Sequence, residues 1–203
     1  MEHPYNSFLV SGGMMITSSY IKDEAKIVQL FGEIDELKAE KVSRDLMETA
    51  GRDSESKRPV QLLISSPGGL VSSGQAIIDT VFNIRNSFGI DVHGIVYGHA
   101  ASMAALLLQS CSKRYATEYS IIMIHGAFFS SLELDGDALS SYKKVITDIT
   151  NNYSKLLASR TNVKADKWAK ILRRSTPTHY TAKEALEIGV IDGIITNDGK
   201  LLS

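Results

Sequence analysis

Three short stretches of the sequence carry residue types that could transfer an acyl group. Ser102 follows an apolar run and has small neighbours, Gly68 and Gly69 form a turn after another apolar run, and His125 ends a third. Acyl transfer by a serine requires an exposed hydroxyl, a base within hydrogen-bond reach, and donors aimed at the developing oxyanion. Together, the three stretches predict a serine hydrolase.

Ser102 also has a purely structural interpretation. The small residues of 98–105 would leave its hydroxyl exposed at the start of a helix, whose free amides supply a positive end. Serine is a preferred N-cap residue, however, so an ordinary helix cap is the alternative. The stretch does not match the G-x-S-x-G elbow of α/β-hydrolases, and local evidence alone favours the cap.

The other two stretches have alternatives of their own. Gly68 and Gly69 let the backbone approach a ligand and point N–H groups into a cleft, but they could equally form a tight turn before a helix. No G-x-x-x-x-G-K-[ST] phosphate loop is present. His125 lies at the carboxyl end of a predicted strand, where ligands collect in open α/β sheets, whereas a lone histidine is more often structural.

The remaining histidines are weaker candidates for the base. His99 could line the same pocket as Ser102, but it lies just before the predicted helix. His3, His93 and His179 fall at the start of the chain, within a strand, and after a proline-containing loop. No pair of His, Cys or carboxylate residues has metal-ligand spacing, so we expect no catalytic metal.

Length and composition indicate a single domain, 1–203, with a sizeable core. The chain has 203 residues, of which 43% are hydrophobic. A net charge of −1 with scattered Lys and Arg argues against a nucleic-acid partner. The sequence has no signal-peptide pattern and no run of ~18 apolar residues that could span a bilayer. The single Cys111, in an apolar run, is expected to be a buried thiol in a reducing, cytoplasmic compartment.

The hydrophobic pattern predicts alternating strands and helices. We expect strands at 25–32, 60–65 and 92–98, each followed by a helix, at 36–50, 72–85 and 101–110. This βαβαβα order predicts right-handed crossovers and a mostly parallel sheet. The expected inward residues are Leu37, Val42, Leu46 and Met47 in the first helix, and Ala76, Ile77, Thr80, Val81 and Ile84 in the second.

The second half of the chain contains an unusually long helix. Apolar residues recur every three or four positions over 138–160, after a turn at 116–119 and a strand at 120–125. A shorter helix is expected at 165–172, a capping box of Thr181 and Glu184 begins another, and a strand at 191–195 follows. Residues 1–20 are polar and small and are expected to be a flexible N-terminal segment.

The order and spacing of the motifs resemble those of the Clp protease proteolytic subunits, within the ClpP/crotonase superfamily. The resemblance rests on Ser-Pro-Gly-Gly at 66–69, Gly-His-Ala-Ala-Ser-Met-Ala-Ala-Leu-Leu-Leu at 98–108 and Met-Ile-His at 123–125. It extends from about Ile27 to Ile195. It implies an α/β fold of repeated β-β-α and βαβ units, with a mostly parallel sheet, flanking helices and one long protruding helix.

The resemblance also implies roles for individual residues. Ser102 would be the nucleophile and His125 its general base, and the backbone amides of Gly69 and Met103 would form the oxyanion hole. His99 would be a wall residue, at a position where the family often has Gln. The helix 138–160 would be the handle helix that joins two rings face to face.

Partners and cofactors follow from the same resemblance. It implies a peptide or protein substrate, a homo-oligomer of heptameric rings stacked in pairs, and an AAA+ unfoldase as a candidate partner. It implies no cofactor for peptide cleavage, no nucleic acid and no membrane.

The sequence departs from the family at three places. Alignment of 184–189 puts Pro177 where the family has the aspartate that orients the histidine. A Ser-His dyad aided by a Thr hydroxyl or a backbone carbonyl, an acid from elsewhere in the fold, and an inactive subunit are the three alternatives. The segment 126–131 replaces the family's Gln-Pro and glycine-rich strand, and the N-terminal segment lacks the usual axial-loop sequence.

We therefore interpret the chain as a serine endopeptidase that hydrolyses unfolded proteins or peptides inside a ring-shaped oligomer. A catalytically silent or weakly active ring subunit is the alternative favoured by the missing aspartate. A phage head-maturation or signal-peptide-type peptidase would share the serine and the fold. A crotonase-like acyl-CoA enzyme would share the oxyanion hole but would not need Ser102 and His125.

Overall fold

The computed structural model of the protein describes residues 26–52, 57–126 and 136–203. The flexible segment expected at 1–20 lies outside the described residues, as does 127–131 of the segment that departs from the family pattern. Among the described residues, no helix is long and apolar enough to cross a membrane.

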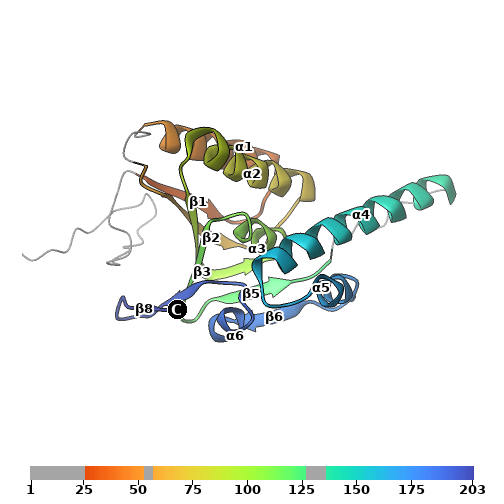
Figure 1. The fold of residues 1–203 in the computed structure, drawn as a ribbon. Helices are drawn as coiled ribbons and strands as arrows, with labels where there is room; N and C mark the ends of the chain where they lie inside the picture. Colours follow the sequence, from red (N-terminus) through yellow and green to blue (C-terminus); the bar gives the residue numbers. More distant parts are fainter. Residues whose placement is uncertain (1–25, 53–56, 127–135) are drawn as a thin grey trace, which may run out of the picture.

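Eight strands of the described chain form one sheet (Figure 1). Along its main path lie β1 (Ile27–Phe31), β2 (Val60–Ser66), β3 (Val92–Ala101), β4 (Lys113–Thr117), β7 (Gly193–Ile195) and β8 (Leu201–Leu202). β5 (Ile121–Ile124) pairs with β3 and with β6 (Thr178–Thr181). All pairs are parallel except β5–β6 and β7–β8. The expected α/β class with a mostly parallel sheet is confirmed.

β3 changes its pairing partner along its length. Its first half, His93–Val96, pairs with β4, and its last three residues, His99–Ala101, pair with β5. The strand is therefore longer than expected and delivers the chain directly to residue 102. The two branches of the sheet diverge around Gly98, which has a φ of 76° that glycine adopts at little cost.

β4 was not expected from the sequence, and the turn predicted at 116–119 is wrong in its first two residues, which belong to this strand. The strand was not recognised because it contains the charged Arg114, which a surface position would normally explain. In the structure Arg114 is buried, and its guanidinium has several partners. Its guanidinium pairs with Asp192 through Nη2–Oδ1, at 2.5 Å, and donates to Gln109 Oε1 and to the carbonyl of Arg160. β6 is only four residues long and mostly polar, and β8 has only two residues between polar neighbours. Neither strand therefore has a hydrophobic pattern that could be recognised in the sequence.

The helices agree closely with the expected pattern. They are α1 (Glu36–Gly51), α2 (Val71–Asn83) with a π-helical extension η2 (Ile84–Phe88), α3 (Met103–Leu108), α4 (Gly136–Arg160), α5 (Ala165–Leu172) and α6 (Ala182–Glu187). α1 and α2 lie together on one side of the sheet (Figure 1). The capping box at the start of α6 is confirmed, with Thr181 and Glu184 each bonding the other's backbone amide.

The inward faces of α1 and α2 agree in part with those expected: Val42, Leu46, Ile77, Val81 and Ile84 are buried. Leu37 is 76% exposed, because the buried stripe of α1 is Ala39, Val42, Leu46, Thr49 and Ala50. Leu37 lies two residues before this stripe, about 200° around a helix of 3.6 residues per turn. In α2, Ser73, Gly74, Ile77, Ile78 and Val81 are buried, whereas Ala76 is exposed and Thr80 is half-buried.

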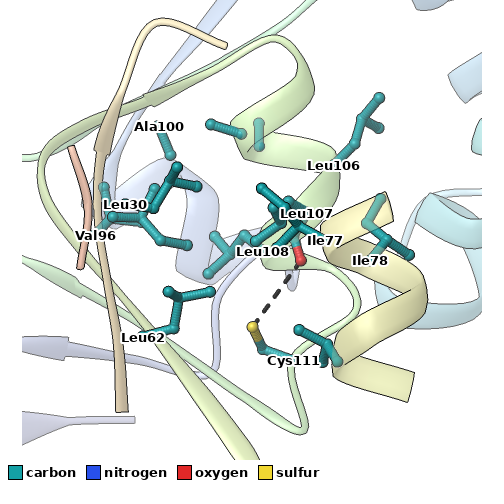
Figure 2. Packing of buried hydrophobic residues seen from close by; sticks show 14 of the residues in the cluster. Leu30, Leu62, Ile77, Ile78, Val96, Ala100, Leu106, Leu107, Leu108 and Cys111 are labelled. Carbon is teal, nitrogen blue, oxygen red and sulfur yellow. Dashed lines mark hydrogen bonds between the residues drawn. The ribbon is translucent and has the colours of Figure 1, made fainter. Parts of the chain in front are cut away.

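The core packs α2 and α3 against the sheet. Figure 2 shows Ile77 and Ile78 of α2 beside the leucines 106–108 of α3, with Leu30, Leu62 and Val96 contributed by the strands. Cys111 is completely buried in this core, and burial raises the pKa of its thiol to about 12. The expectation of a buried thiol is therefore confirmed, and such a thiol is unreactive in the folded state.

α4 has a buried half and an exposed half. Thr150, Tyr153, Ser154 and Leu157 are buried in its second half, whereas Val145 in the first half is 46% exposed. Arg160 ties the end of the helix to the body by donating to the carbonyls of Cys111 and Ser112, at 2.8 and 3.3 Å. The first half therefore projects away from the sheet (Figure 1), which confirms the long protruding helix.

Candidate active site

Ser102 occupies a strained turn between β3 and α3. Its φ is 55° and its ψ is −122°, and among the described residues only Lys57 is another non-glycine residue with a positive φ. Such a conformation costs of order 1–3 kcal/mol and persists only when the surrounding structure enforces it. The Ser102 amide donates to the carbonyl of Met123 at 2.8 Å, which holds the turn against β5.

The hydroxyl of Ser102 is not used to cap the helix. Ser102 stands at the N-cap position of α3, but its side chain accepts no hydrogen bond from the helix amides. The interpretation of Ser102 as an ordinary cap is therefore wrong. A serine at a strained junction of strand and helix, with its hydroxyl directed elsewhere, is the arrangement that exposes a nucleophile.

His125 lies beside Ser102 because their strands are neighbours. The parallel register pairs Ala101 of β3 with Met123 of β5, so the two residues follow adjacent strand ends. Both side chains line one pocket. The imidazole is half-buried, and its Nδ1 lies 2.5 Å from the carbonyl oxygen of Gly126. The structure thus brings together the two residues that the sequence proposed for nucleophile and base.

The turn of Gly68 and Gly69 packs directly against the turn of Ser102. A Cβ added at Gly68 would lie 2.7 Å from the Cβ of Ser102 and 2.9 Å from the amide nitrogen of Met103, and one at Gly69 would lie 2.2 Å from the carbonyl of Ile34. Both glycines also have a positive φ, of 93° and 152°. Glycine is required at both positions, because a Cβ at 68 would collide with the turn of Ser102 and one at 69 with the backbone of Ile34.

Two backbone amides of these turns are candidates for binding a ligand. Gly68 donates to Ser66 Oγ at 3.1 Å, and its carbonyl accepts from Ile34, which fixes the turn. Among the backbone hydrogen bonds that the described residues form in turns, loops and helix caps, none has the amide of Gly69 or Met103 as its donor. Met103 is the first residue of α3, whose opening N–H groups have no partner within a helix.

The pocket beside Ser102 and His125 is mainly apolar. It is a hollow partly open to solvent, and the roughly 320 Å³ of space between its walls includes open solvent. Apolar side chains from four helices line it: Val71 from α2, Met103 and Leu106 from α3, Ile149 and Tyr153 from α4, and Leu172 from α5. Gly126 and Thr150 complete the wall, whereas His99, the expected wall residue, is exposed and does not line this pocket.

The side chain of Met103 is held between α2 and α4. A Cβ added at Gly74 would lie 2.1 Å from Cγ of Met103, so only glycine leaves room for this side chain. The Tyr153 hydroxyl lies 3.6 Å from Sδ of Met103 and 3.3 Å from Oε1 of Gln75. Burial raises the Tyr153 pKa to about 12, so the hydroxyl keeps its proton. Tyr153 was not identified from the sequence as a site residue, although its place in the apolar repeat of 138–160 indicates an inward side chain.

No carboxylate is among the described residues that line the pocket. The antiparallel register pairs Ile124 with Thr178, so one further step would bring His125 opposite Pro177, which is exposed. Within the described ranges, no three His, Cys, Asp or Glu residues form a group that could hold a metal ion.

Comparison with known proteins places the chain among proteases. The family model described as Clp protease matches residues 14–198. A protein of Borrelia garinii subsp. bavariensis named "ATP-dependent Clp protease proteolytic subunit" is 33% identical over 181 residues, which cover 85% of this chain and 86% of that protein. A protein of Borreliella afzelii with the same name is 32% identical over 181 residues, covering 85% and 84%.

Proposed function

The chain belongs to the Clp protease family, and we propose from this that it is a serine endopeptidase in which Ser102 attacks the peptide carbonyl and His125 is the general base. The observation that carries the proposal is the turn at Ser102. Its positive φ costs free energy of folding, and its hydroxyl caps no helix. Because Ser102 also shares a pocket with a histidine, a catalytic role explains why the strained serine is retained.

The proposed reaction needs only groups of this chain and water. Ser102 Oγ adds to the peptide carbonyl while its proton passes to Nε2 of His125, and the amides of Gly69 and Met103 hold the oxyanion. His125 then gives the proton to the leaving amine, and the acyl-enzyme forms. Water, deprotonated by His125, then attacks the acyl carbon; the ester bond to Oγ breaks, His125 returns the proton to Oγ, and the carboxylic acid leaves.

The pocket supports a preference for an apolar residue on the acyl side of the scissile bond. Val71, Leu106, Ile149 and Leu172 offer an apolar surface next to Ser102, and burial of a side chain of Leu or Met size is worth about 1.5–3 kcal/mol. We therefore propose peptides and unfolded proteins with apolar residues at this position as substrates.

The proposal extends to assembly and compartment. The exposed first half of α4 supports its use as a contact between copies of the chain, in homo-oligomeric rings. An AAA+ unfoldase is the proposed partner, since both curated relatives are named ATP-dependent. A cytoplasmic location is proposed on the lone, buried Cys111.

A catalytically silent ring subunit is the second candidate. It is favoured by the absence of a carboxylate from the described lining of the pocket and by proline at 177. The strained serine argues against it, because a subunit without chemistry would gain stability by replacing Ser102 with glycine.

Hydrolysis of fluorogenic peptides tests the proposal. The assembled protein should cleave a peptide with Leu or Met before the reporter, and Ser102→Ala and His125→Ala should each abolish cleavage. Ser72→Ala, which changes an exposed serine of α2, is the matched control and should cleave at the wild-type rate. Equal cleavage by wild type and Ser102→Ala would show a contaminant and defeat the proposal, as would no cleavage by any form.

A further inference from the structure

We propose that the main-chain carbonyl of Gly126 orients the catalytic histidine in this protein. The inference rests on the proposed role of His125 as the base for Ser102. It is drawn from the contact between Nδ1 of His125 and the Gly126 carbonyl oxygen, and from the packing that fixes this carbonyl.

The contact determines which ring nitrogen carries the proton. A peptide carbonyl can only accept a hydrogen bond, so Nδ1 of His125 must donate. In the neutral imidazole, the proton then sits on Nδ1, and Nε2 keeps the lone pair that takes the proton from Ser102. This is the tautomer that an orienting carboxylate selects in a serine-histidine-aspartate triad.

The packing around Gly126 holds the carbonyl in place. Gly126 is buried, and a Cβ at this position would lie 1.8 Å from the carbonyl oxygen of Leu172, the last residue of α5. α5 is itself anchored by Trp168, which is completely buried and donates from Nε1 to Thr161 Oγ1 at 2.8 Å. The chain therefore passes between β5 and α5 with no room for a side chain at 126.

The neighbouring strand provides no carboxylate. β6 pairs with β5 up to Thr178, and the next residue towards His125 is Pro177, whose side chain has no hydrogen-bonding atom. Of the three alternatives left by the sequence, the observed contact supports the backbone carbonyl.

A carbonyl provides orientation without a full negative charge. Loss of the correct tautomer costs about 10⁴ in turnover where a triad depends on its aspartate. Charge-assisted hydrogen bonds are roughly twice as strong as neutral ones, so the missing charge alone should cost only about tenfold. We therefore expect an active enzyme in which His125 is correctly oriented.

Nitrogen NMR of the assembled protein, labelled with ¹⁵N-histidine, reads the tautomer directly. Spectra are recorded about two pH units above the ordinary histidine pKa of ~6.5, and His125 is assigned from the signal lost in His125→Gln. We expect a protonated Nδ1 and an unprotonated Nε2. A protonated Nε2 would overturn the inference.

The same spectrum of Ser102→Ala separates this inference from the proposed function. That variant cannot perform the chemistry but keeps the contact to Gly126, so it should retain the Nδ1–H tautomer. If wild type fails to cleave peptides yet shows this tautomer, the proposed function is wrong and the orienting contact stands. Cleavage together with the opposite tautomer would contradict the inference alone.

Pro177→Asp gives a second, kinetic test, with Pro177→Asn as the uncharged control. If the Gly126 carbonyl already orients His125, an added carboxylate supplies only charge, and kcat/KM should rise by no more than about tenfold. A rise of 10³-fold or more with Pro177→Asp, absent in Pro177→Asn, would show that His125 lacks an orienting group in the wild type and would overturn the inference.

Discussion

Replacement of Gly126 by alanine should displace the orienting carbonyl while leaving the rest of the fold in place. The new Cβ would start 1.8 Å from the Leu172 carbonyl oxygen, and real contacts of this kind are essentially never below 3.0 Å. The backbone at 126 must therefore move by about 1.2 Å, or α5 must yield by the same amount. Because α5 is anchored by the completely buried Trp168, we expect the backbone at 126 to move, which takes its carbonyl away from Nδ1 of His125.

The size of the effect follows from this displacement. A misplacement of about 1 Å near a catalytic group can cost about 10²-fold in rate, which corresponds to about 2.7 kcal/mol of transition-state stabilisation. Overpacking of this kind costs about 1–3 kcal/mol of stability as well. We expect kcat of Gly126→Ala to fall about 10²-fold, with a lower Tm and with the Nδ1–H tautomer of His125 partly lost.

Gly51→Ala is the matched control for this experiment. A Cβ at Gly51 would meet nothing within 4 Å, and this glycine lies at the end of α1, far along the chain from the site. The Gly51→Ala variant should keep wild-type kcat. Its free energy of unfolding should rise by up to about 1 kcal/mol, because alanine restricts the unfolded chain more than glycine does. Peptide cleavage, Tm and the histidine spectrum are measured for both variants. A Gly126→Ala protein with wild-type kcat and an unchanged tautomer would refute the reasoning.

Three further predictions concern neighbouring features. Gly68→Ala should slow acylation of Ser102 at least about 10²-fold, because its Cβ would lie 2.7 Å from Cβ of the serine; wild-type labelling by an active-site probe would contradict this. Tyr153→Phe should lower kcat about fivefold, for one lost hydrogen bond near Met103, with an unchanged fold by circular dichroism. Cys111, with a pKa of about 12, is protonated at pH 8 and should resist iodoacetamide until the protein is unfolded; rapid alkylation of the native protein would be inconsistent with its burial.

Much of the fold could be predicted because its elements have strong periodic patterns. The capping box at Thr181 fixed the start of α6, and the repeat of apolar residues identified α4 almost to its ends. β4 could not be found in the same way, since Arg114, its second residue, is buried with its charge paired to Asp192, 78 residues away. Long-range ion pairs of this kind leave no local signal in the sequence.

The sequence identified the two side chains that the structure brings together in the pocket, but it left the partner of the histidine open among three alternatives. Ser102 and His125 were recognised from their residue types and from the strands before them, which the parallel register then brought together. The alternative role of Ser102 as a cap could be rejected only from the structure, in which its side chain accepts no hydrogen bond from the amides of α3. The contact from Nδ1 of His125 to Gly126 depends on the path of the backbone past α5, and residue types alone do not encode that path.

Covalent labelling of Ser102 by a fluorophosphonate tests the central claim most directly. The probe needs an activated serine and an oxyanion hole but no particular peptide, so it reports on Ser102 and His125 independently of substrate preference. We predict one adduct per chain, located at Ser102 by peptide mass spectrometry, lost in Ser102→Ala and strongly slowed in His125→Ala. A correctly assembled protein that carries no adduct, or an adduct at another serine, would contradict the account.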